Sequence, residues 1–283
     1  MDIVVISSIL AIGTLGLLFG ASLAYASKKF AVEVDPKIEE IIEKLPGANC
    51  GGCGYPGCSG YAEAVVKSGA PMTLCAPGGD EVVQEIANIM GVKAIEAGEK
   101  MVAVVQCRGD NENAPKRFHY AGITNCHAAQ IIMGGDKACV YGCLGLGTCV
   151  ESCPFGAMKM GDNGLPIVFE DKCTACGMCV SACPRGIMKL IPVSQKIFIG
   201  CVSQDKGKAV KQVCKVGCTG CTLCSKPKIT PSGSIEMKGN LPEIVDPKAE
   251  DLINAVEKCP TKSFVVRENK QIESTTLQKN EAI

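Results

Sequence analysis

Residues 173–184 read Cys173-Thr-Ala-Cys176-Gly-Met-Cys179-Val-Ser-Ala-Cys183-Pro184. Three cysteines separated by two residues each cannot easily pair with one another as disulfides, but they can converge on one face of a cubane iron–sulfur cluster. The fourth cysteine precedes a proline that turns the chain away, toward a second cluster. Zinc ligation and disulfide formation are the alternatives, and we favour the cluster. A protein with this run belongs in a reducing compartment.

The composition also favours metal-based cohesion. Twenty of the 283 residues are cysteine, whereas aromatic side chains make up 4% of the chain and tryptophan is absent. With so few large aromatic side chains, disulfides or metal clusters have to supply part of the stability. Lys plus Arg and Asp plus Glu both number 29, so the net charge of zero gives no sign of a nucleic-acid partner.

The residues before this run form the other half of the two-cluster pattern known from bacterial ferredoxins. Their cysteines read Cys139-x3-Cys143-x5-Cys149-x3-Cys153-Pro154, and the usual second cysteine of a half falls at Leu146. Cys139 is available to replace it. Since the fourth cysteine of each half binds the other cluster, we assign one cluster to Cys139, Cys143, Cys149 and Cys183. The other is assigned to Cys153, Cys173, Cys176 and Cys179.

A third cysteine block looks like a damaged copy of the second. Cys218-x2-Cys221-x2-Cys224 lacks its fourth cysteine, because Lys228 stands there, and Cys259-Pro260 lies 35 residues beyond Cys224. Stepping back from Cys259 by 4, 7 and 10 residues meets only Ala255, Leu252 and Ala249. The missing cysteines are those of one cluster, so we assign the surviving cluster to Cys218, Cys221, Cys224 and Cys259. We expect Leu252, Ile253 and Val256 to form the buried side of a helix that fills the lost cluster's place.

The first cysteine block follows a short amphipathic helix. Asp35-Pro36 is typical of a helix start, and the helix should stop at Pro46-Gly47. The spacing C-x2-C-x4-C-x16-C then makes one four-cysteine site, with zinc as the alternative to a cluster. Its glycines allow tight backbone turns that aim amide groups at the sulfurs. The proposed ligands are Cys50, Cys53, Cys58 and Cys75.

Four cysteines remain after these assignments: Cys107, Cys126, Cys201 and Cys214. They form a tentative fifth cluster, with buried free thiols as the alternative. Cys107 and Cys201 each follow a strand-like segment, at residues 101–105 and 196–200. Cys139-x3-Cys143 also resembles Cys214-x3-Cys218, which suggests an internal duplication and makes Cys139 the least secure ligand of its set. Four clusters are therefore expected and five are an open alternative.

The first residues predict a membrane anchor. Residues 3–26 carry no charge, and a stretch of about 24 apolar residues can span a bilayer. Asp2 precedes this stretch and Lys28-Lys29 follow it, the reverse of a cleavable signal peptide. The excess of positive charge after the helix places the rest of the chain in the cytoplasm, on the inner face of the cell membrane.

These features predict the organisation of the whole chain. The fold class is a single N-terminal transmembrane helix, a small α-rich four-cysteine domain and α+β ferredoxin-like domains, one with two clusters and one degenerate. We expect an anchor over residues 1–26, a linker over 27–34, a 4Fe-4S four-cysteine domain over 35–95, a connecting segment over 96–133, a two-cluster 4Fe-4S domain over 134–192, a degenerate ferredoxin-like domain over 193–267 and a polar tail over 268–283.

The order of these parts resembles the B subunit of the Rnf electron-transport complexes. The likeness rests on the uncharged anchor, then residues 45–58 (Leu-Pro-Gly-Ala-Asn-Cys-Gly-Gly-Cys-Gly-Tyr-Pro-Gly-Cys), then ferredoxin repeats. The resemblance implies a subunit of a translocase that oxidises reduced ferredoxin, reduces NAD and moves Na⁺ or H⁺. Its implied partners are reduced ferredoxin and the other membrane subunits of such a complex. The chain would relay electrons through serial 4Fe-4S clusters and would have no catalytic residues of its own.

Two further functions stay open from the sequence. One is the anchored cluster subunit of a membrane hydrogenase or formate dehydrogenase, and the other is a cluster-based redox sensor or scaffold. No glycine-rich dinucleotide motif follows a strand, so we expect no direct NAD binding on this chain. Lys206, Lys208, Lys211 and Lys215 could form a docking patch for an acidic electron carrier, although such a charge run is usually a solvated surface.

Overall fold

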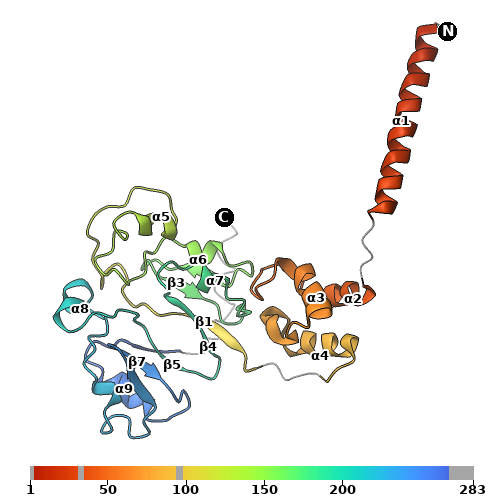
Figure 1. The fold of residues 1–283 in the computed structure, drawn as a ribbon. Coiled ribbons are helices and arrows are strands. Elements are labelled where there is room, and N and C mark those ends of the chain that lie inside the picture. The colour runs from red at the N-terminus through yellow and green to blue at the C-terminus, as the bar shows by residue number, and fades with distance from the viewer. Residues whose placement is uncertain (1–2, 31–34, 94–97, 268–283) are drawn as a thin grey trace, which may run out of the picture.

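The computed structural model describes residues 3–30, 35–93 and 98–267 (Figure 1). Helix α1 (Ile3–Lys29) stands apart from the remainder of the chain, and its apolar side chains are exposed. Within it, Val5–Lys29 is long and apolar enough to cross a membrane, with a mean hydropathy of 1.9. The expected apolar N-terminal helix is therefore present. The expected polar tail, residues 268–283, lies outside the described residues.

The first block is a small helical unit with its own core. It contains α2 (Pro36–Lys44), α3 (Gly57–Ser68) and α4 (Gly79–Met90), with 3-10 turns at Met72–Leu74 and Ala76–Gly78. Asp35 caps α2, because its Oδ1 accepts a hydrogen bond from the backbone N–H of Lys37 at 2.9 Å. Ile41, Tyr61 and Ile86 are almost wholly buried between the helices. The predicted helix start at Asp35-Pro36 is confirmed.

The second block contains two short antiparallel sheets. Strand β1 (Met101–Val105) pairs with β4 (Met188–Pro192), in a register that places Met101 opposite Pro192. Strands β2 (Met158–Met160) and β3 (Pro166–Val168) form a hairpin around a turn at Gly164. Three short helices complete the block: α5 (Cys126–Ile131), α6 (Thr148–Glu151) and α7 (Met178–Ser181).

Strand β1 lies within the segment that the sequence treats as a connection, residues 96–133. Val102, Ala103 and Val104 are buried in the core of the second block, against Cys173 and Met188. Three consecutive buried residues make β1 an internal part of this block, because a mere connection would not bury its side chains. The described part of residues 96–133 therefore extends the second block on its N-terminal side.

The third block has a similar plan with different details. Strand β5 (Ile197–Ile199) pairs with β8 (Phe264–Val266), and β6 (Ile235–Lys238) pairs with β7 (Leu241–Ile244). Its helices are α8 (Lys208–Val213), the 3-10 turn Leu223–Ser225 and α9 (Leu252–Lys258). The second block lies between the first and third blocks (Figure 1).

Helix α9 corrects one detail of the sequence prediction. Leu252 is 2% exposed and Ala255 is 1% exposed, whereas Ile253 is 45% exposed. Val256 packs against the same core as Leu252. Residues three and four apart share a helix face, and the adjacent residue points about 100° away from it. The buried side of α9 is thus Leu252, Ala255 and Val256, and the expected burial of Ile253 is wrong.

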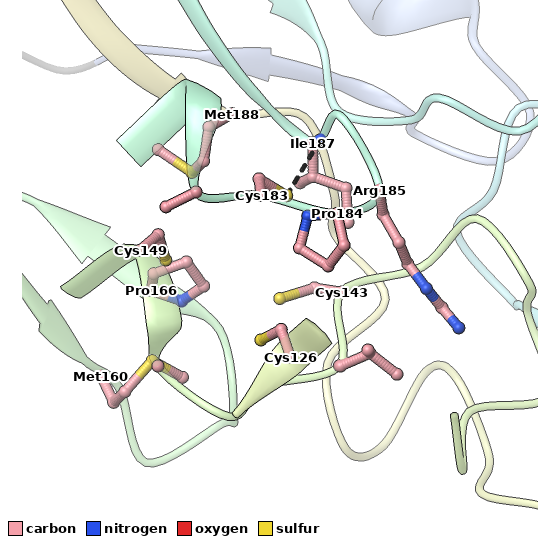
Figure 2. Close-up of a pocket in the computed structure, with 13 residues that line it drawn as sticks. Cys126, Cys143, Cys149, Met160, Pro166, Cys183, Pro184, Arg185, Ile187 and Met188 are labelled. Atoms are coloured by element: carbon pink, nitrogen blue, oxygen red, sulfur yellow. Dashed lines mark hydrogen bonds between the residues drawn. The ribbon is translucent and has the colours of Figure 1, made fainter. Parts of the chain in front are cut away.

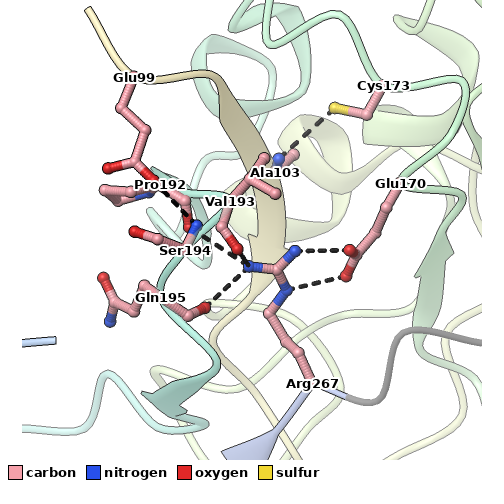
Figure 3. Close-up of polar contacts among 9 residues, drawn as sticks. All are labelled: Glu99, Ala103, Glu170, Cys173, Pro192, Val193, Ser194, Gln195 and Arg267. Carbon is pink, nitrogen blue, oxygen red and sulfur yellow. Dashed lines mark hydrogen bonds and ion pairs between the residues drawn. The ribbon is translucent and has the colours of Figure 1, made fainter. Parts of the chain in front are cut away.

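Arg267, directly after β8, fastens the third block to the second (Figure 3). Its guanidinium forms two parallel hydrogen bonds to the carboxylate of Glu170, which follows β3. It also donates to the backbone carbonyls of Val193 at 3.3 Å and of Gln195 at 2.8 Å. The Arg267 side chain is only 6% exposed, so this attachment is largely shielded from water.

Candidate metal centres

The twenty cysteines, all free thiols, gather into five groups of four, which we name sites A to E. Site A occupies the first block and consists of Cys50, Cys53, Cys58 and Cys75. Burial raises the pKa of the Cys75 thiol, and the thiols of the other three raise it further. Gly54 and Gly57 both have φ of +87°, which lets the backbone turn between the cysteines. The structure thus brings together the first set that the sequence groups.

Site B consists of Cys153, Cys173, Cys176 and Cys179, which line one cavity beside β1. The backbone N–H of Ala103 in β1 points at Cys173 Sγ over 3.5 Å. Burial raises the pKa of Cys179 to about 12, and the nearby thiols of Cys173 and Cys176 add to this rise. The sequence groups the same four cysteines.

Site C consists of Cys126, Cys143, Cys149 and Cys183, which line the cavity shown in Figure 2. Asn125 caps α5 through hydrogen bonds to the N–H groups of His127 and Ala128. The N–H of Cys126 donates to Thr148 Oγ1 at 2.7 Å. This bond holds the start of α5 against the loop that precedes Cys149.

Site C differs from the sequence grouping at one position. The sequence places Cys139 with Cys143, Cys149 and Cys183, but the structure places Cys126 there and turns Cys139 toward another cavity. Burial raises the pKa of Cys149 to about 11, and the thiol of Cys126 is the largest further contribution. The sequence signal for Cys126 is weak, because this cysteine lies in no spaced motif and reaches the site only through the fold of residues 98–133.

Site D consists of Cys107, Cys139, Cys201 and Cys214, which line a cavity between the second and third blocks. Three of these belong to the tentative fifth set of the sequence, and Cys139 replaces Cys126. Burial raises the pKa of Cys201 to about 11. The backbone N–H of Cys143 donates to Cys107 Sγ at 3.4 Å.

Site D has an internal two-fold pattern that explains this exchange. Cys107 follows β1 and Cys201 follows β5, the first strand of each block. The pairs Cys139-x3-Cys143 and Cys214-x3-Cys218 each give their first cysteine to site D and their second to a neighbouring site. The suspected duplication therefore places Cys139 with Cys214. Each block contributes two cysteines to the site between them.

Site E consists of Cys218, Cys221, Cys224 and Cys259, which line one cavity in the third block. The backbone N–H of Ser263 donates to Cys259 Sγ at 3.3 Å. Burial raises the pKa of Cys224 to about 11, with the Cys221 and Cys259 thiols adding to the rise. Cys259 thus joins the other three although it lies 35 residues beyond Cys224, as the sequence predicts.

Contacts between neighbouring sites give them a continuous order from A to E. Gly52, between two cysteines of site A, packs so closely on site B that an added Cβ would overlap the backbone carbonyl of Cys176. Cys50 also raises the pKa of Cys176. Site B meets site C in one packed core, which contains Cys179 of site B with Cys149 and Cys183 of site C.

The other two steps run through backbone amides. Sites C and D share the hydrogen bond from Cys143 N–H to Cys107 Sγ. Sites D and E share a hydrogen bond from the backbone of Cys218 to the Cys201 thiol, which lowers the pKa of Cys201 against the larger effect of burial. In each case a ligand candidate of one site hydrogen-bonds the sulfur of the next.

The electrostatics of the four-cysteine sites favour a bound cation between the thiols. Burial, and then neighbouring thiols, raise the pKa of Cys143, Cys179 and Cys224, and four thiols so close together cannot ionise at once without positive charge between them. Backbone N–H groups already point at several sulfurs, as they do around iron–sulfur clusters. Among the described residues, no group of three or more His, Cys, Asp or Glu side chains is arranged to hold a single metal ion.

Two family models match parts of the chain. A model for an Fe–S cluster matches residues 45–77, and a 4Fe-4S dicluster domain matches residues 136–188. The dicluster match includes Cys139 and leaves out Cys126. The extent of a match does not assign ligands, and the structure places Cys126 at site C and Cys139 at site D.

The chain is also similar to named proteins over most of its length. It is 45% identical over 267 residues to the B subunit of the "Ion-translocating oxidoreductase complex" of Methanosarcina acetivorans, covering 94% of this chain and 100% of that protein. It is 51% identical to the B subunit of the "Proton-translocating ferredoxin:NAD(+) oxidoreductase complex" of Clostridium ljungdahlii, over 72% of each chain. The B subunit of the "Na(+)-translocating ferredoxin:NAD(+) oxidoreductase complex" of Acetobacterium woodii is 43% identical, over 88% of this chain and 74% of that one. This chain belongs to the family of B subunits of the ion-translocating (Rnf) oxidoreductase complexes.

Proposed function

We propose that this chain is the membrane-anchored electron-transfer subunit of a ferredoxin:NAD⁺ oxidoreductase complex, and that each of sites A to E holds one 4Fe-4S cluster. The observation that carries the proposal is the unbroken series of five four-cysteine sites, in which each site contacts the next. The family membership favours this function over a hydrogenase or formate dehydrogenase subunit and over a redox sensor.

The donor sets support iron–sulfur clusters over zinc, because among the described residues no group of cysteines is arranged to hold a single metal ion. A zinc ion would draw four sulfurs to about 2.3 Å from one point, whereas the cubane of a cluster holds its cysteines farther apart. When bound, such clusters supply one-electron redox chemistry near −400 mV. The protein's own part is to hold the sulfurs, exclude water and direct amide N–H groups at them, as Ala103, Ile187 and Ser263 do.

The two ends of the series differ in a way that suggests a direction. Site A lies in the block whose first helix begins at Pro36, a few residues after α1 ends at Lys29. Site E lies in the third block, where Cys221 is the one exposed cysteine of the twenty. We therefore infer that electrons enter at site E and leave from site A, toward the membrane partners.

The surface around site E suits an acidic electron carrier such as ferredoxin. Lys206, Lys208, Lys211 and Lys215 are all exposed. Lys206 lies beside the loop of Cys221, because its Cγ would be 3.5 Å from a Cβ placed on Gly220. Lys226 and Lys228, after Cys224, are exposed on the same loop. Such a surface would steer an anionic partner toward the exposed end of the series.

The orientation in the membrane follows from the charges that flank α1. Lys28 and Lys29 lie in its last turn, and no acidic residue lies in its first turn. By the positive-inside rule the blocks after α1 are cytoplasmic. This side is also the compartment that keeps thiols reduced and holds ferredoxin.

The decisive experiment measures how fast the anaerobically purified full chain is reduced. We expect reduced ferredoxin to react much faster than NADH, and the ferredoxin rate to fall as added salt screens the attraction. Reversing two charges beside site E (Lys206→Glu with Lys208→Glu) should slow the reaction and flatten its dependence on salt. The control Lys37→Glu reverses an exposed charge on α2, in the first block, and should leave the rate unchanged. Direct reduction by NADH at a comparable rate would refute the proposal.

A further inference from the structure

Site D has more buried positive charge around it than the cavities of sites B, C and E, since the lysines near site E are exposed. Within the described part of the chain, the cavities of sites B and E have no charged side chain in their linings, and that of site C has only Arg185. The cavity of site D is lined by Arg108. Two further cations, Lys137 and Arg185, reach the backbone around it.

Lys137 is the most deeply buried of these cations, with 1% of its surface exposed. Its Nζ donates to the carbonyl of Gly109 at 2.8 Å and to the carbonyl of Asp110 at 3.0 Å. Gly109 itself touches the site, since a Cβ placed on it would lie 3.5 Å from Cys214 Sγ and 3.6 Å from Cys107 Sγ. The ammonium is therefore separated from two sulfurs of site D by a single residue.

The charge of Lys137 lacks a close acidic partner. None of the ion pairs among the described residues includes it, and the neighbouring Asp136 pairs with Lys116 at 2.9 Å. Hydrogen bonds from Asn113 and Glu112 to Asp110 Oδ1 lower the pKa of that carboxyl group against the opposing effect of burial, and Lys137 adds only a smaller lowering. A buried cation without a partner is costly unless negative charge lies close by.

Arg185 approaches site D from the side of site C. In Figure 2 its side chain points away from the cavity of site C. Its guanidinium donates to the carbonyls of Cys139, at 3.0 Å, and of Gly142. The thiols of Cys139, Cys143 and Cys107 all act on this guanidinium electrostatically. Two fixed positive charges thus flank site D, and none is found in the linings of sites B and E.

We propose that site D has the highest reduction potential of the five sites and that Lys137 is the positioning residue that sets it. Adding an electron makes a cluster more negative, so a nearby buried cation stabilises the reduced form more than the oxidised form. The potentials of such clusters follow net charge, hydrogen bonds and solvent exposure, and a buried charge is weakly screened. The inference rests on the proposed cluster at site D.

The consequence is that site D, which lies within the series, would retain the first electron that the chain receives. One reduced ferredoxin returns to its oxidised form, and its single electron comes to rest at site D, which gains one negative charge. No bond is broken and no proton is needed. Reducing one NAD⁺ takes two electrons, so a protein that receives them singly can keep the first away from both exposed ends until the second arrives.

The test is a reductive titration of the anaerobic full chain, followed by electron paramagnetic resonance. We expect one cluster signal to appear before the others in the unsubstituted protein. Lys137→Met removes the charge and keeps the length of the side chain, so this signal should move to a more negative potential. Lys137→Arg should keep it near its original position. Lys159→Met removes an exposed lysine and serves as the matched control, with no expected shift.

Two further variants keep the result decisive. Cys201→Ala should abolish the signal that appears first, which assigns it to site D. If Lys137→Met binds less iron, Arg185→Met provides the second removal of charge and should lower the same potential. The inference is overturned if a fully loaded Lys137→Met protein keeps the first signal where it was, or if that signal survives Cys201→Ala. A total of about 16 iron atoms in the unsubstituted protein, against about 20 for five clusters, would instead refute the proposed cluster at site D.

Discussion

At the scale of single residues, the exchange of Cys126 and Cys139 decides how the clusters are arranged. Both cysteines lie near Cys143 in the sequence, and spacing alone favours Cys139. The structure favours Cys126, because Thr148 Oγ1 fixes its backbone beside site C, whereas the Cys139 carbonyl faces Arg185 on the side of site D. Two side chains that are not cysteines, Thr148 and Arg185, thus hold the backbone of Cys126 at site C and that of Cys139 at site D.

Paired cysteine substitutions test this exchange through iron content. Cys139→Ala combined with Cys201→Ala removes two cysteines of one site, so the protein should lose about four iron atoms of about 20. Cys126→Ala combined with Cys201→Ala removes one cysteine from each of two sites, and the loss should be about eight. The sequence grouping predicts the opposite pair of results. Iron assays on the two double variants, with each single variant as control, distinguish the groupings.

Gly52 supplies a second prediction at this scale. Because an added Cβ would overlap the carbonyl of Cys176, Gly52→Ala must push site A away from site B. We expect full iron content and slower electron transfer between these two sites, since transfer slows steeply with distance. Gly98→Ala is the matched control, because its Cβ would meet no atom within 4 Å. With site D reduced beforehand, flash reduction of site E followed by the appearance of reduced site A measures the difference, and equal rates in both variants would contradict the prediction.

At the scale of the elements, short sequence patterns predicted the helices and strands that depend only on neighbouring residues. The helix start at Asp35 and the strands after residues 100 and 196 follow from short runs of residues, and the structure has them. The role of β1 in the second block, the outward side of Ile253 and the burial of Lys137 depend on contacts between distant segments. Contacts of this kind leave no periodicity or spacing in the sequence from which they could be predicted.

The attachment of β8 through Arg267 can be tested at the scale of the elements. Arg267→Met leaves the carboxylate of Glu170 and several carbonyls without their donor, and we expect the attachment to weaken by about 2 kcal/mol, reduced from a fully buried pair because Glu170 is 36% exposed. The denaturation midpoint of the loaded protein should fall, and proteases should separate the third block sooner. Lys238→Met breaks an exposed pair with Glu243 and should change stability by less than about 0.5 kcal/mol. Equal losses of stability from the two substitutions would show that Arg267 contributes no more than an exposed ion pair does.

At the scale of the whole molecule, the described residues form three hydrophobic cores and one helix that stands apart from them. Each block has a core that includes cysteines or packs against them, and Phe198 and Val265 of the third block also pack into the core of the second. Site D uses two cysteines from each of two blocks, so the second and third blocks would share the proposed metal centre as well as the contacts of Arg267. Loss of the proposed cluster at site D should therefore weaken the attachment of the third block to the second.

Removing residues 1–26 tests the anchor and its orientation. The shortened protein should be soluble and brown, since every cysteine lies after the anchor. In cells, an enzyme reporter fused after residue 283 should be active as a cytoplasmic fusion and inactive as a periplasmic one. Replacing Lys28 and Lys29 with Gln should weaken this orientation without removing the protein from the membrane. A periplasmic reporter signal from the unsubstituted protein would contradict both the topology and the reducing compartment.

The short link between α1 and α2 also raises the effective concentration of site A beside the membrane. From Lys29 to Asp35 the chain can reach at most about 20 Å, at about 3.3–3.6 Å per residue. Site A is thereby confined to a small volume beside the membrane, where its effective concentration toward any acceptor there is on the order of millimolar. Its encounter with that acceptor is effectively unimolecular, so the two surfaces need only weak affinity and can separate quickly after each electron. The same block released from its anchor would meet the acceptor by ordinary diffusion, and a weak surface would then become limiting.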